Sequence, residues 1–300
     1  MAFRTEHLET LVVLVDEGSF DKAARRLQVT SSAVSQRIKA MEQSAGQVLV
    51  QRTIPVEATA AGDVALRFGR QMMLLEAQAS KALDSDPGGG TKTTIPLAIN
   101  ADSLATWFLD ALAPTPETEG VLYDILREDQ EHTVELLRAG KVMAAVTSNK
   151  AVVQGCKSEV LGVMRYHAIS SPDFLAKHLD GEATAESLDR APVVNFDRKD
   201  DLQHRFFREF AGHHTRSPRH YVPTSNAFLR AVHMGLGWGL LPEQQCLESL
   251  ESGQLVDLIP DRIVDVPLYW QRWTLSTPVL EALTDKVKQT AARELLPFTG

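Results

Sequence analysis

The sequence predicts an α/β protein that carries a separate all-helical unit, a winged helix-turn-helix, at its N-terminus. Three observations lead to this fold class. Apolar residues recur at helical spacing through the first 58 positions, a heptad pattern follows, and short β-branched runs then alternate with helical segments. A chain of 300 residues is also too long for one average domain, so we expect two or three compact units.

The composition is that of an ordinary globular protein, with 44% apolar and 23% charged residues. The sequence has no run of about 18 uncharged apolar residues and no apolar signal-peptide core at its start, so we expect a cytoplasmic protein without membrane contact. Cys156 and Cys246 lie 90 residues apart, outside any metal-ligand or redox spacing. We interpret both as small buried side chains.

The net charge of −8 includes a basic segment near the N-terminus. Between Lys22 and Arg52 stand six basic residues and one acid, Glu42, which gives this segment a net charge of +5. Because salt screens charges beyond about 8–10 Å, the local sign decides whether a surface attracts phosphate. An ordinary solvent-exposed surface could carry the same charges, so the charge alone does not indicate DNA binding. The helical pattern of these residues has to be considered with it.

The first 58 residues fit three helices and a wing. The first helix has one apolar face and ends at Gly18. Ser19 is the expected N-cap of a second helix, which has a buried side of its own. A short turn over 28–30 then leads into a third helix over 31–43, which is the spacing of a helix-turn-helix. The apolar faces of the first two helices comprise Leu8, Leu11, Val12 and Val15, and Phe20, Ala23, Ala24 and Leu27.

The third helix has two unlike faces. Val34, Ile38 and Met41 fall within about 60° of one another at 100° per residue and should be buried. Gln, Ser and Lys can read base edges in the major groove, and none of them repels phosphate. We therefore predict that the opposite face binds DNA; a three-helix unit of purely structural use is the alternative. That polar face comprises Ser32, Ser35, Gln36, Lys39 and Gln43.

Further DNA contacts are predicted around this face. Thr30 immediately precedes the helix, and Arg37 lies nearer its buried side, where it would reach backbone phosphate rather than a base. After Gly46, the segments 48–52 and 56–58 read as two strands of a wing. Arg52 in the first of these strands is placed to touch phosphate.

A long helical segment follows the wing. From Thr59 to Leu83 its apolar residues alternate spacings of four and three, which predicts a coiled-coil linker that makes the protein a dimer. Packing against the chain's own globular part is the rival interpretation. Pro87 and the glycines 88–90 then predict a hinge, without the Lys-Ser/Thr of a phosphate loop. The heptad seam comprises Ala61, Ala65, Phe68, Met72, Leu75, Ala79 and Ala82.

Beyond the hinge, predicted strands alternate with predicted helices. This alternation indicates a mostly parallel sheet with helices on both faces, and such sheets bind ligands at the carboxyl ends of their strands. The predicted strands are 95–99, 121–126, 142–146, 160–169, 193–196 and 267–274. The predicted helices are 103–113, 133–139, 200–210, 227–234 and a C-terminal helix through Leu296.

Together, the N-terminal motifs resemble the signature of LysR-type transcriptional regulators, and the linker, hinge and total length agree with that family. Ser31 departs from the signature, because the family commonly has proline there, and Val50 stands where a Phe is usual. The resemblance implies a periplasmic-binding-protein-like effector domain with two subdomains. The matching residues are Gly18-Ser19-Phe20, Ala23-Ala24, Leu27, the segment 29–39, Met41-Glu42 and Gly46.

The family's organisation implies five parts in this chain. We expect a winged helix-turn-helix over 1–58, a dimerising linker helix over 59–84 and a hinge over 85–92. Effector subdomain I would then comprise 93–167 and 269–300, and subdomain II would comprise 168–268.

Stretches of the effector region resemble more narrowly the LysG/ArgP branch of the family, which responds to lysine or arginine. The resemblance implies a basic amino acid as effector, no cofactor, and an amino-acid exporter among the target genes, with activation and repression both left open. Its partners would be promoter DNA, RNA polymerase and copies of the chain itself, as a homodimer or homotetramer. The stretches are 155–157, 161–162, 165–166, 171–174, 196–203 and 235–242.

A cationic amino acid needs acids for its cations and hydroxyls or helix N-terminal amides for its carboxylate. Asp102 and Asp197 each follow a predicted strand, and Thr147 ends one. If these acids have ordinary roles, Asp102 caps its helix and Asp197 pairs with a neighbouring cation, Arg198 or Lys199. The predicted effector-binding residues are Asp102, Ser103, Thr147, Asp197, Thr224 and Ser225.

Two other classes of function deserve comparison. A nucleoid- or replication-associated DNA-binding protein without an effector would discriminate weakly between sequences and depend steeply on salt. An enzyme is disfavoured, because the sequence has no metal cluster, phosphate loop, nucleophile elbow or paired catalytic carboxylates. The pair His213-His214 lacks a companion ligand at metal spacing, so we read it as part of a loop.

Overall fold

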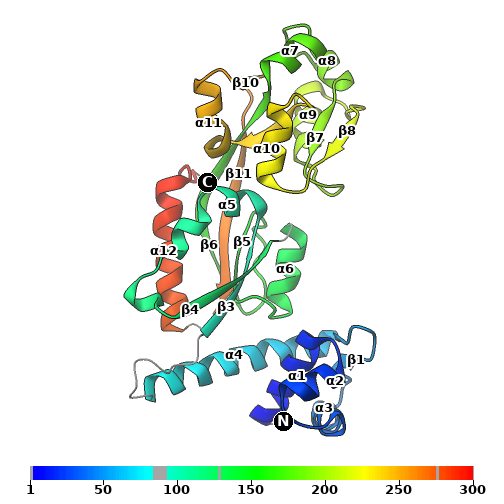
Figure 1. Cartoon of the computed structure of the whole chain (residues 1–300), viewed down its shortest axis with the longest axis vertical. Coiled ribbons are helices and arrows are strands. Elements are labelled where there is room, and N and C mark those ends of the chain that lie inside the picture. Colours follow the sequence, from blue (N-terminus) through cyan, green and yellow to red (C-terminus); the bar gives the residue numbers. More distant parts are fainter. Residues whose placement is uncertain (1–2, 84–92, 128–129, 275–276, 300) are drawn as a thin grey trace. The chain divides into compact units, whose positions relative to one another are not determined.

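The computed structural model describes residues 3–83, 93–127, 130–274 and 277–299 (Figure 1). It divides into two compact units, each drawn from three separate stretches of chain. The predicted hinge over 85–92 falls outside the described residues. The first unit comprises 1–99, 114–158 and 270–282, and the second comprises 100–113, 159–269 and 283–300.

The first unit begins with the predicted three helices and two-stranded wing. Helices α1 and α3 end at Gly18 and Gly46, whose φ angles of 66° and 67° lie in the left-handed region that favours glycine. The wing strands pair antiparallel, with Val50 opposite Ala58. The elements are α1 (Thr5–Glu17), α2 (Phe20–Arg26), α3 (Ser31–Ala45), β1 (Val50–Gln51) and β2 (Glu57–Ala58).

The core of this winged unit is the apolar one that the helical periodicity predicts. Val34, Ile38 and Met41 of α3 are fully buried, together with Leu11 and Leu14 of α1. Their burial fixes α3 against α1 and α2, and therefore determines which side of α3 faces outward.

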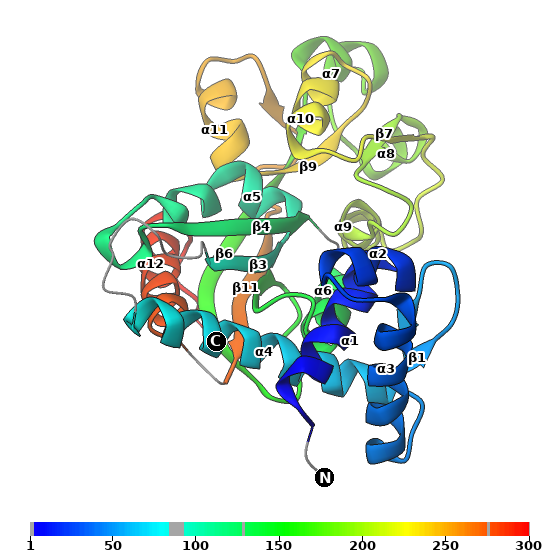
Figure 2. The ribbon, with the colours of Figure 1, turned by 60° about the horizontal axis from the view of Figure 1, so that its bottom comes forward.

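Helix α4 (Ala60–Leu83) follows the wing and packs against α1 (Figure 2). Ala65 is buried in the same core as α1, and Ala61 and Met72 pack against that core, so this part of the predicted seam follows the rival interpretation of packing against the chain's own globular part. Two other seam residues, Phe68 and Leu75, are 56% and 41% exposed to solvent. Val64, next to them on the helix, is 46% exposed. These three lie within about 40° of one another on the helix. We call them the open face of α4.

Helix α4 also contacts the α/β part of the first unit. The guanidinium of Arg67 donates to the carbonyl of Gln154 at 2.8 Å, and that of Arg70 donates to the carbonyl of Ala139 at 3.3 Å. Gly140 lies so close to the helix that a Cβ there would come within 2.6 Å of Arg67 Cα. Helix α4 is therefore held against two loops of the first unit, the one that contains Ala139 and Gly140 and the one that contains Gln154.

Strands β3, β4 and β5 of the first unit are parallel, as predicted. Strand β3 pairs in parallel with β4 on one side and β5 on the other, and the end of β11 continues the sheet beyond β5. Buried apolar residues such as Leu97 and Val146 fill the middle strands. The elements are β3 (Thr93–Ile99), η2 (Pro116–Thr118), β4 (Val121–Arg127), α6 (Gln130–Arg138), β5 (Ala144–Thr147) and the last residues of β11 (Val264–Trp273).

The strands of the second unit are mixed in direction, which corrects the expectation of a mostly parallel sheet there. Strand β6 pairs antiparallel with both β9 and β10, whereas β7 and β8 pair in parallel. The strands are β6 (Cys156–Ser170), β7 (Val193–Asn195), β8 (Arg219–Tyr221), β9 (Gly239–Pro242) and β10 (Val256–Asp257).

The helices of the second unit include several that the periodicity missed. The predicted helix over 103–113 is in fact two pieces, and Asn100 caps the first of them. The elements are α5 (Ala101–Thr106), η1 (Phe108–Leu112), α7 (Pro172–His178), α8 (Ala185–Arg190), α9 (Leu202–Ala211), α10 (Ser225–His233), α11 (Glu243–Glu251) and most of α12 (Pro278–Glu294).

Candidate nucleic-acid interface and acidic cluster

The outward face of α3 is the polar one. Ser32, Gln36 and Lys39 are exposed and Ser35 is half-buried, while the apolar residues on the far side of the helix lie in the core. A helix of about 10–12 Å diameter with such a face fits the major groove of B-DNA, about 12 Å wide. The structure thus leaves these hydrogen-bonding side chains free to meet base edges.

Thr30 and Arg37 occupy more specialised positions than the sequence predicts. The Thr30 hydroxyl accepts a 3.1 Å hydrogen bond from the backbone N–H of Ala33, so it caps α3. The Arg37 guanidinium turns toward α1, where it donates to the Thr10 hydroxyl at 3.1 Å. Both side chains therefore also position the reading helix.

The wing is held to α3 by the one acid of the basic segment. A carboxylate oxygen of Glu42 accepts a 3.0 Å hydrogen bond from the backbone N–H of Leu49, at the start of the wing. Arg52 in the wing is exposed, and its guanidinium lies 5.3 Å from the centre of the Phe20 ring. This cation–π contact orients the charge of Arg52 beside the N-terminal end of α2.

A second set of polar residues lies in the second unit around Asp102 of α5. The Tyr166 hydroxyl donates to Asp102 Oδ2 at 2.8 Å, and the Ser225 hydroxyl donates to Oδ1. The amide of Gln245 in turn donates to the Ser225 hydroxyl at 3.2 Å. Asp102 and Gln245 are half-buried, whereas Tyr166 and Ser225 are buried.

Electrostatics make this cluster receptive to a cation. Desolvation raises the pKa of Asp102, although the hydrogen bonds from Ser225 and Tyr166 act in the opposite direction. Burial likewise raises the pKa of Asp200, and the nearby charges of Asp102 and Asp197 add to that rise. A bound cation would relieve this cost, because an opposite charge within about 4–6 Å favours the ionised carboxylate.

Around Asp102, the structure separates the predicted residues by role. Asn100, not Asp102, caps α5, because the Asn100 side chain accepts a 2.8 Å hydrogen bond from the Ser103 N–H. The Ser103 side chain is fully buried, and its hydroxyl has no hydrogen-bond partner among the described residues. Asp197 accepts from the backbone N–H groups of Lys199 and Asp200, at 2.7 and 2.9 Å, and so builds a turn.

The remaining predicted residues are Thr224 and Thr147. Thr224 precedes α10, is exposed, and makes no side-chain capping bond to that helix. Thr147 belongs to the first unit, where its hydroxyl accepts from the backbone N–H of Asn149 at 3.1 Å. Sequence reasoning missed Tyr166 and Gln245 as partners of Ser225 and Asp102, although Tyr166 falls within a stretch of family resemblance.

Two family models match the chain over most of its length. The model of the bacterial regulatory helix-turn-helix protein, lysR family, matches residues 5–63, and the model of the LysR substrate binding domain matches residues 94–292. The chain belongs to the LysR family of regulators. Its fold class is accordingly the predicted one, a helix-turn-helix domain followed by an α/β effector domain of two subdomains.

Within the LysR family, the chain is similar to regulators named LysG and ArgP. It is 43% identical to LysG of Mycobacterium tuberculosis over 291 residues, which cover 95% of this chain and 92% of that protein. A crystal structure of ArgP from the same organism superposes with a TM-score of 0.89 at 41% identity, covering 97% and 98% of the two chains.

A second solved structure is of full-length LysG from Corynebacterium glutamicum with bound effector Arg. It superposes on this LysR-family chain with a TM-score of 0.81 at 39% identity, covering 98% of this chain and all of that one. The relatives are transcriptional regulators, which favours the same class for this chain over an enzyme. Among the described residues, no helix is long and apolar enough to cross a membrane. Nor do they contain a group of three or more His, Cys, Asp or Glu side chains suited to a metal ion.

Proposed function

We propose that the protein is a dimeric LysR-type regulator that binds promoter DNA through α3 and responds to lysine or arginine bound at Asp102. The observation that carries the proposal is the two-faced α3, whose core residues are buried and whose Ser32, Gln36 and Lys39 are exposed. The similar proteins named LysG and ArgP support the choice of effector.

The DNA-reading roles follow from side-chain chemistry. Gln36 can bond an adenine bidentately, and Lys39 can reach guanine or phosphate. Ser32 and Ser35 can bond either a base or a phosphate, and Arg52 in the wing meets only the backbone. The exporter gene as target, and RNA polymerase as a partner, belong to the same proposal and rest on the resemblance to the lysine-export regulators.

The effector would be held by groups of opposite chemistry. Its side-chain cation would pair with Asp102, whose carboxylate is already oriented by Tyr166 and Ser225. Its carboxylate could take the N-terminal amides of α10 and the uncommitted Thr224 hydroxyl. Ser103 and Asp197 complete the proposed site in the second unit, and the role of Thr147 of the first unit stays a prediction.

Dimerisation would use the open face of α4. Three large apolar side chains on one stripe of a helix are costly to leave in water, and a second copy of the stripe would cover them. A dimer presents two reading helices to two half-sites of one promoter. We place such a protein in the bacterial cytoplasm with its DNA, and keep the five-part division of the chain as part of this proposal.

The test compares the protein's own upstream intergenic DNA with random DNA of equal length. A regulator should prefer the upstream fragment by roughly 10³-fold or more, and arginine or lysine should change the footprint. Equal affinity for both DNAs at every salt concentration would instead indicate the nucleoid-associated alternative, and the proposal would fail.

A further inference from the structure

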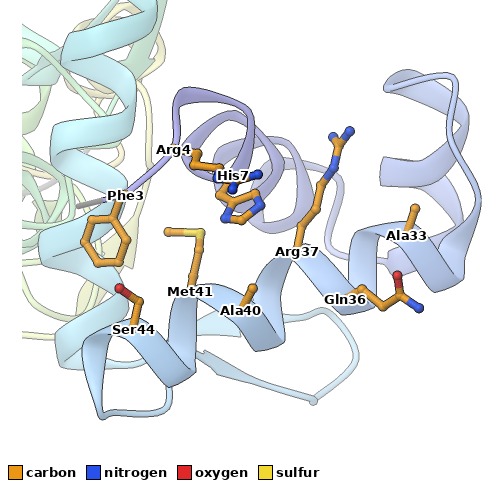
Figure 3. A pocket seen from close by; sticks show the side chains of 9 residues that line it. All are labelled: Phe3, Arg4, His7, Ala33, Gln36, Arg37, Ala40, Met41 and Ser44. Atoms are coloured by element: carbon orange, nitrogen blue, oxygen red, sulfur yellow. The ribbon is translucent and has the colours of Figure 1, made fainter. Parts of the chain in front are cut away.

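A groove lies between α1 and α3 in the first unit, next to the face of α3 that we assign to base reading (Figure 3). Its volume is about 540 Å³. Arg4 and His7 line it from the start of α1, and Gln36, Arg37 and Ser44 line it from α3. Figure 3 shows Arg4 and His7 opposite the helix that carries Arg37, so two arginines and a histidine from two parts of the chain line this groove.

One acid lies among these two arginines and the histidine. The Glu6 carboxylate is 3.7 Å from the Arg4 guanidinium, 3.8 Å from the His7 ring and 3.7 Å from the Arg37 guanidinium. Charge-assisted hydrogen bonds are shorter, about 2.7–2.9 Å, so Glu6 approaches all three groups without a close bond to any. Glu6 is also half exposed, so an external anion can compete with it.

The cation contributed by α3 is held in place. Arg37 Nη1 donates to the Thr10 hydroxyl at 3.1 Å, and that hydroxyl donates to the Glu6 carbonyl at 2.6 Å. Thr10 is fully buried, so its hydrogen bond with Arg37 is shielded from water. The second guanidinium nitrogen, Nη2, lies 3.7 Å from the Glu6 carboxylate, and Arg37 is one of the residues that line the groove.

The position of the groove on α3 suits the edge of a DNA groove. Ala33, Arg37 and Ala40 lie about 100° around the helix from the exposed stripe of Ser32 and Lys39, and Gln36 lies on the border between them. A helix that fills the major groove meets bases with one face and the sugar–phosphate backbones with its flanks. The cationic groove occupies one such flank.

We propose that this groove binds a backbone phosphate of DNA, and that Glu6 takes the place of that phosphate when DNA is absent. The inference rests on the proposed function and adds Arg4 and His7 to the DNA-binding residues. Phosphate binding displaces the Glu6 carboxylate from the cations, so Glu6 lowers the affinity for every DNA sequence alike. Its removal should therefore strengthen binding without changing base preference.

The experiment measures the affinity of the full-length protein for operator and random DNA over a range of salt concentrations. Glu6→Gln should tighten binding to both DNAs by about two- to five-fold. Arg4→Gln should weaken both and reduce the slope of log K against log salt by about one, because one phosphate contact is lost. Arg4 is 77% exposed, so this variant should fold normally, which thermal unfolding checks.

Glu9→Gln is the matched control, since Glu9 is an exposed acid on the same helix, whereas Glu6 is the acid that pairs with Arg4, His7 and Arg37. The inference is overturned if Glu6→Gln and Glu9→Gln change affinity equally, or if Arg4→Gln leaves the salt slope unchanged. If the wild type prefers its operator but Glu6→Gln and Arg4→Gln behave like the control, the proposed function stands and the phosphate groove is contradicted. If the wild type shows no operator preference, the proposed function is contradicted, and the salt slopes still decide whether the groove binds phosphate.

Discussion

The Tyr166 hydroxyl donates a 2.8 Å hydrogen bond to Oδ2 of Asp102, although the two residues are 64 positions apart in the chain. The bond orients a half-buried carboxylate whose pKa is raised by desolvation. The same environment raises the pKa of Tyr166 well above its usual value, so the hydroxyl keeps its proton and remains a donor. In the proposed site, this carboxylate would pair with the cation of the effector.

Tyr166→Phe should weaken arginine binding by about five- to ten-fold, because it removes one neutral donor and leaves the carboxylate less well oriented. Ser225→Ala should act similarly through Oδ1. Calorimetric titration of each variant measures the effect. Tyr269→Phe, which removes another buried tyrosine hydroxyl in the same unit, provides the control. An arginine affinity that falls equally in the control would contradict the role of Tyr166.

Arginine binding should strengthen as the pH rises through the raised pKa of Asp102. Above that pKa, and without ligand, Asp102 carries a negative charge that no cation balances, which lowers the free energy of unfolding. The bound cation balances this charge and raises the free energy of unfolding again. The increase in melting temperature produced by saturating arginine should therefore grow with pH. In Asp102→Asn this pH dependence should vanish. A ligand-induced shift that is flat with pH in the wild type would contradict the prediction.

His167 should make stability depend on pH in the opposite sense. Its ring nitrogens lie 2.9 Å from Asp257 and 2.9 Å from Glu243, and the hydrogen bond to Asp257 is the main cause of its raised pKa. This stabilisation is fully present below the unfolded value of about 6.5 and is lost as the pH rises through the folded value. Urea unfolding should show the loss in wild type and not in His167→Gln. Parallel pH profiles for the two proteins would contradict it.

Phe68→Glu should convert the dimer into monomers at micromolar concentration, because the charge falls in the middle of the open face of α4. Light scattering after size exclusion measures the mass. Leu109→Glu introduces the same charge at an equally exposed apolar residue, 57% against 56%, outside α4. A Phe68→Glu protein that remains a dimer would show that the open face is covered in some other way.

Gly140→Ala should lower the free energy of unfolding by more than a simple glycine replacement does. The backbone at Gly140 has a φ of 66°, and a Cβ there would also meet Arg67 of α4 at 2.6 Å. Gly120→Ala is the matched control, since its φ of 76° carries the same strain but nothing lies within 4 Å. Left-handed strain alone costs about 1–2 kcal/mol at either position, so a larger loss at Gly140 than at Gly120 measures the contact with α4. Equal losses would contradict it.

The face of α3 could be predicted because helical periodicity directly records burial. Val34, Ile38 and Met41 recur at helical spacing and are apolar, so they mark the side of α3 that is buried in the core. The polar residues between them lie on the outward side. The seam of α4 could be predicted only in part. Ala65 and Phe68 are neighbours on the helix wheel, and nothing local shows that α1 covers one and leaves the other exposed.

The acidic cluster shows where sequence reasoning stops. The sequence singles out Asp102 because it follows a predicted strand and Ser225 because it precedes a predicted helix, but it does not show that these residues, 123 positions apart, are hydrogen-bonded. Tyr166 lies within a long strand and carries no local sign of its role. The antiparallel pairing of β6 with β9 is equally non-local, because alternating strands and helices do not encode strand direction.

The most direct test is calorimetric titration of the full-length protein with L-arginine and with L-citrulline, its neutral counterpart of nearly the same shape. We expect arginine to bind the wild type and citrulline to bind at least about 30-fold more weakly, because only the cation can pair with Asp102. Asp102→Asn should bind the two ligands alike. Equal binding of arginine and citrulline to the wild type, or undiminished arginine binding by Asp102→Asn, would contradict the account.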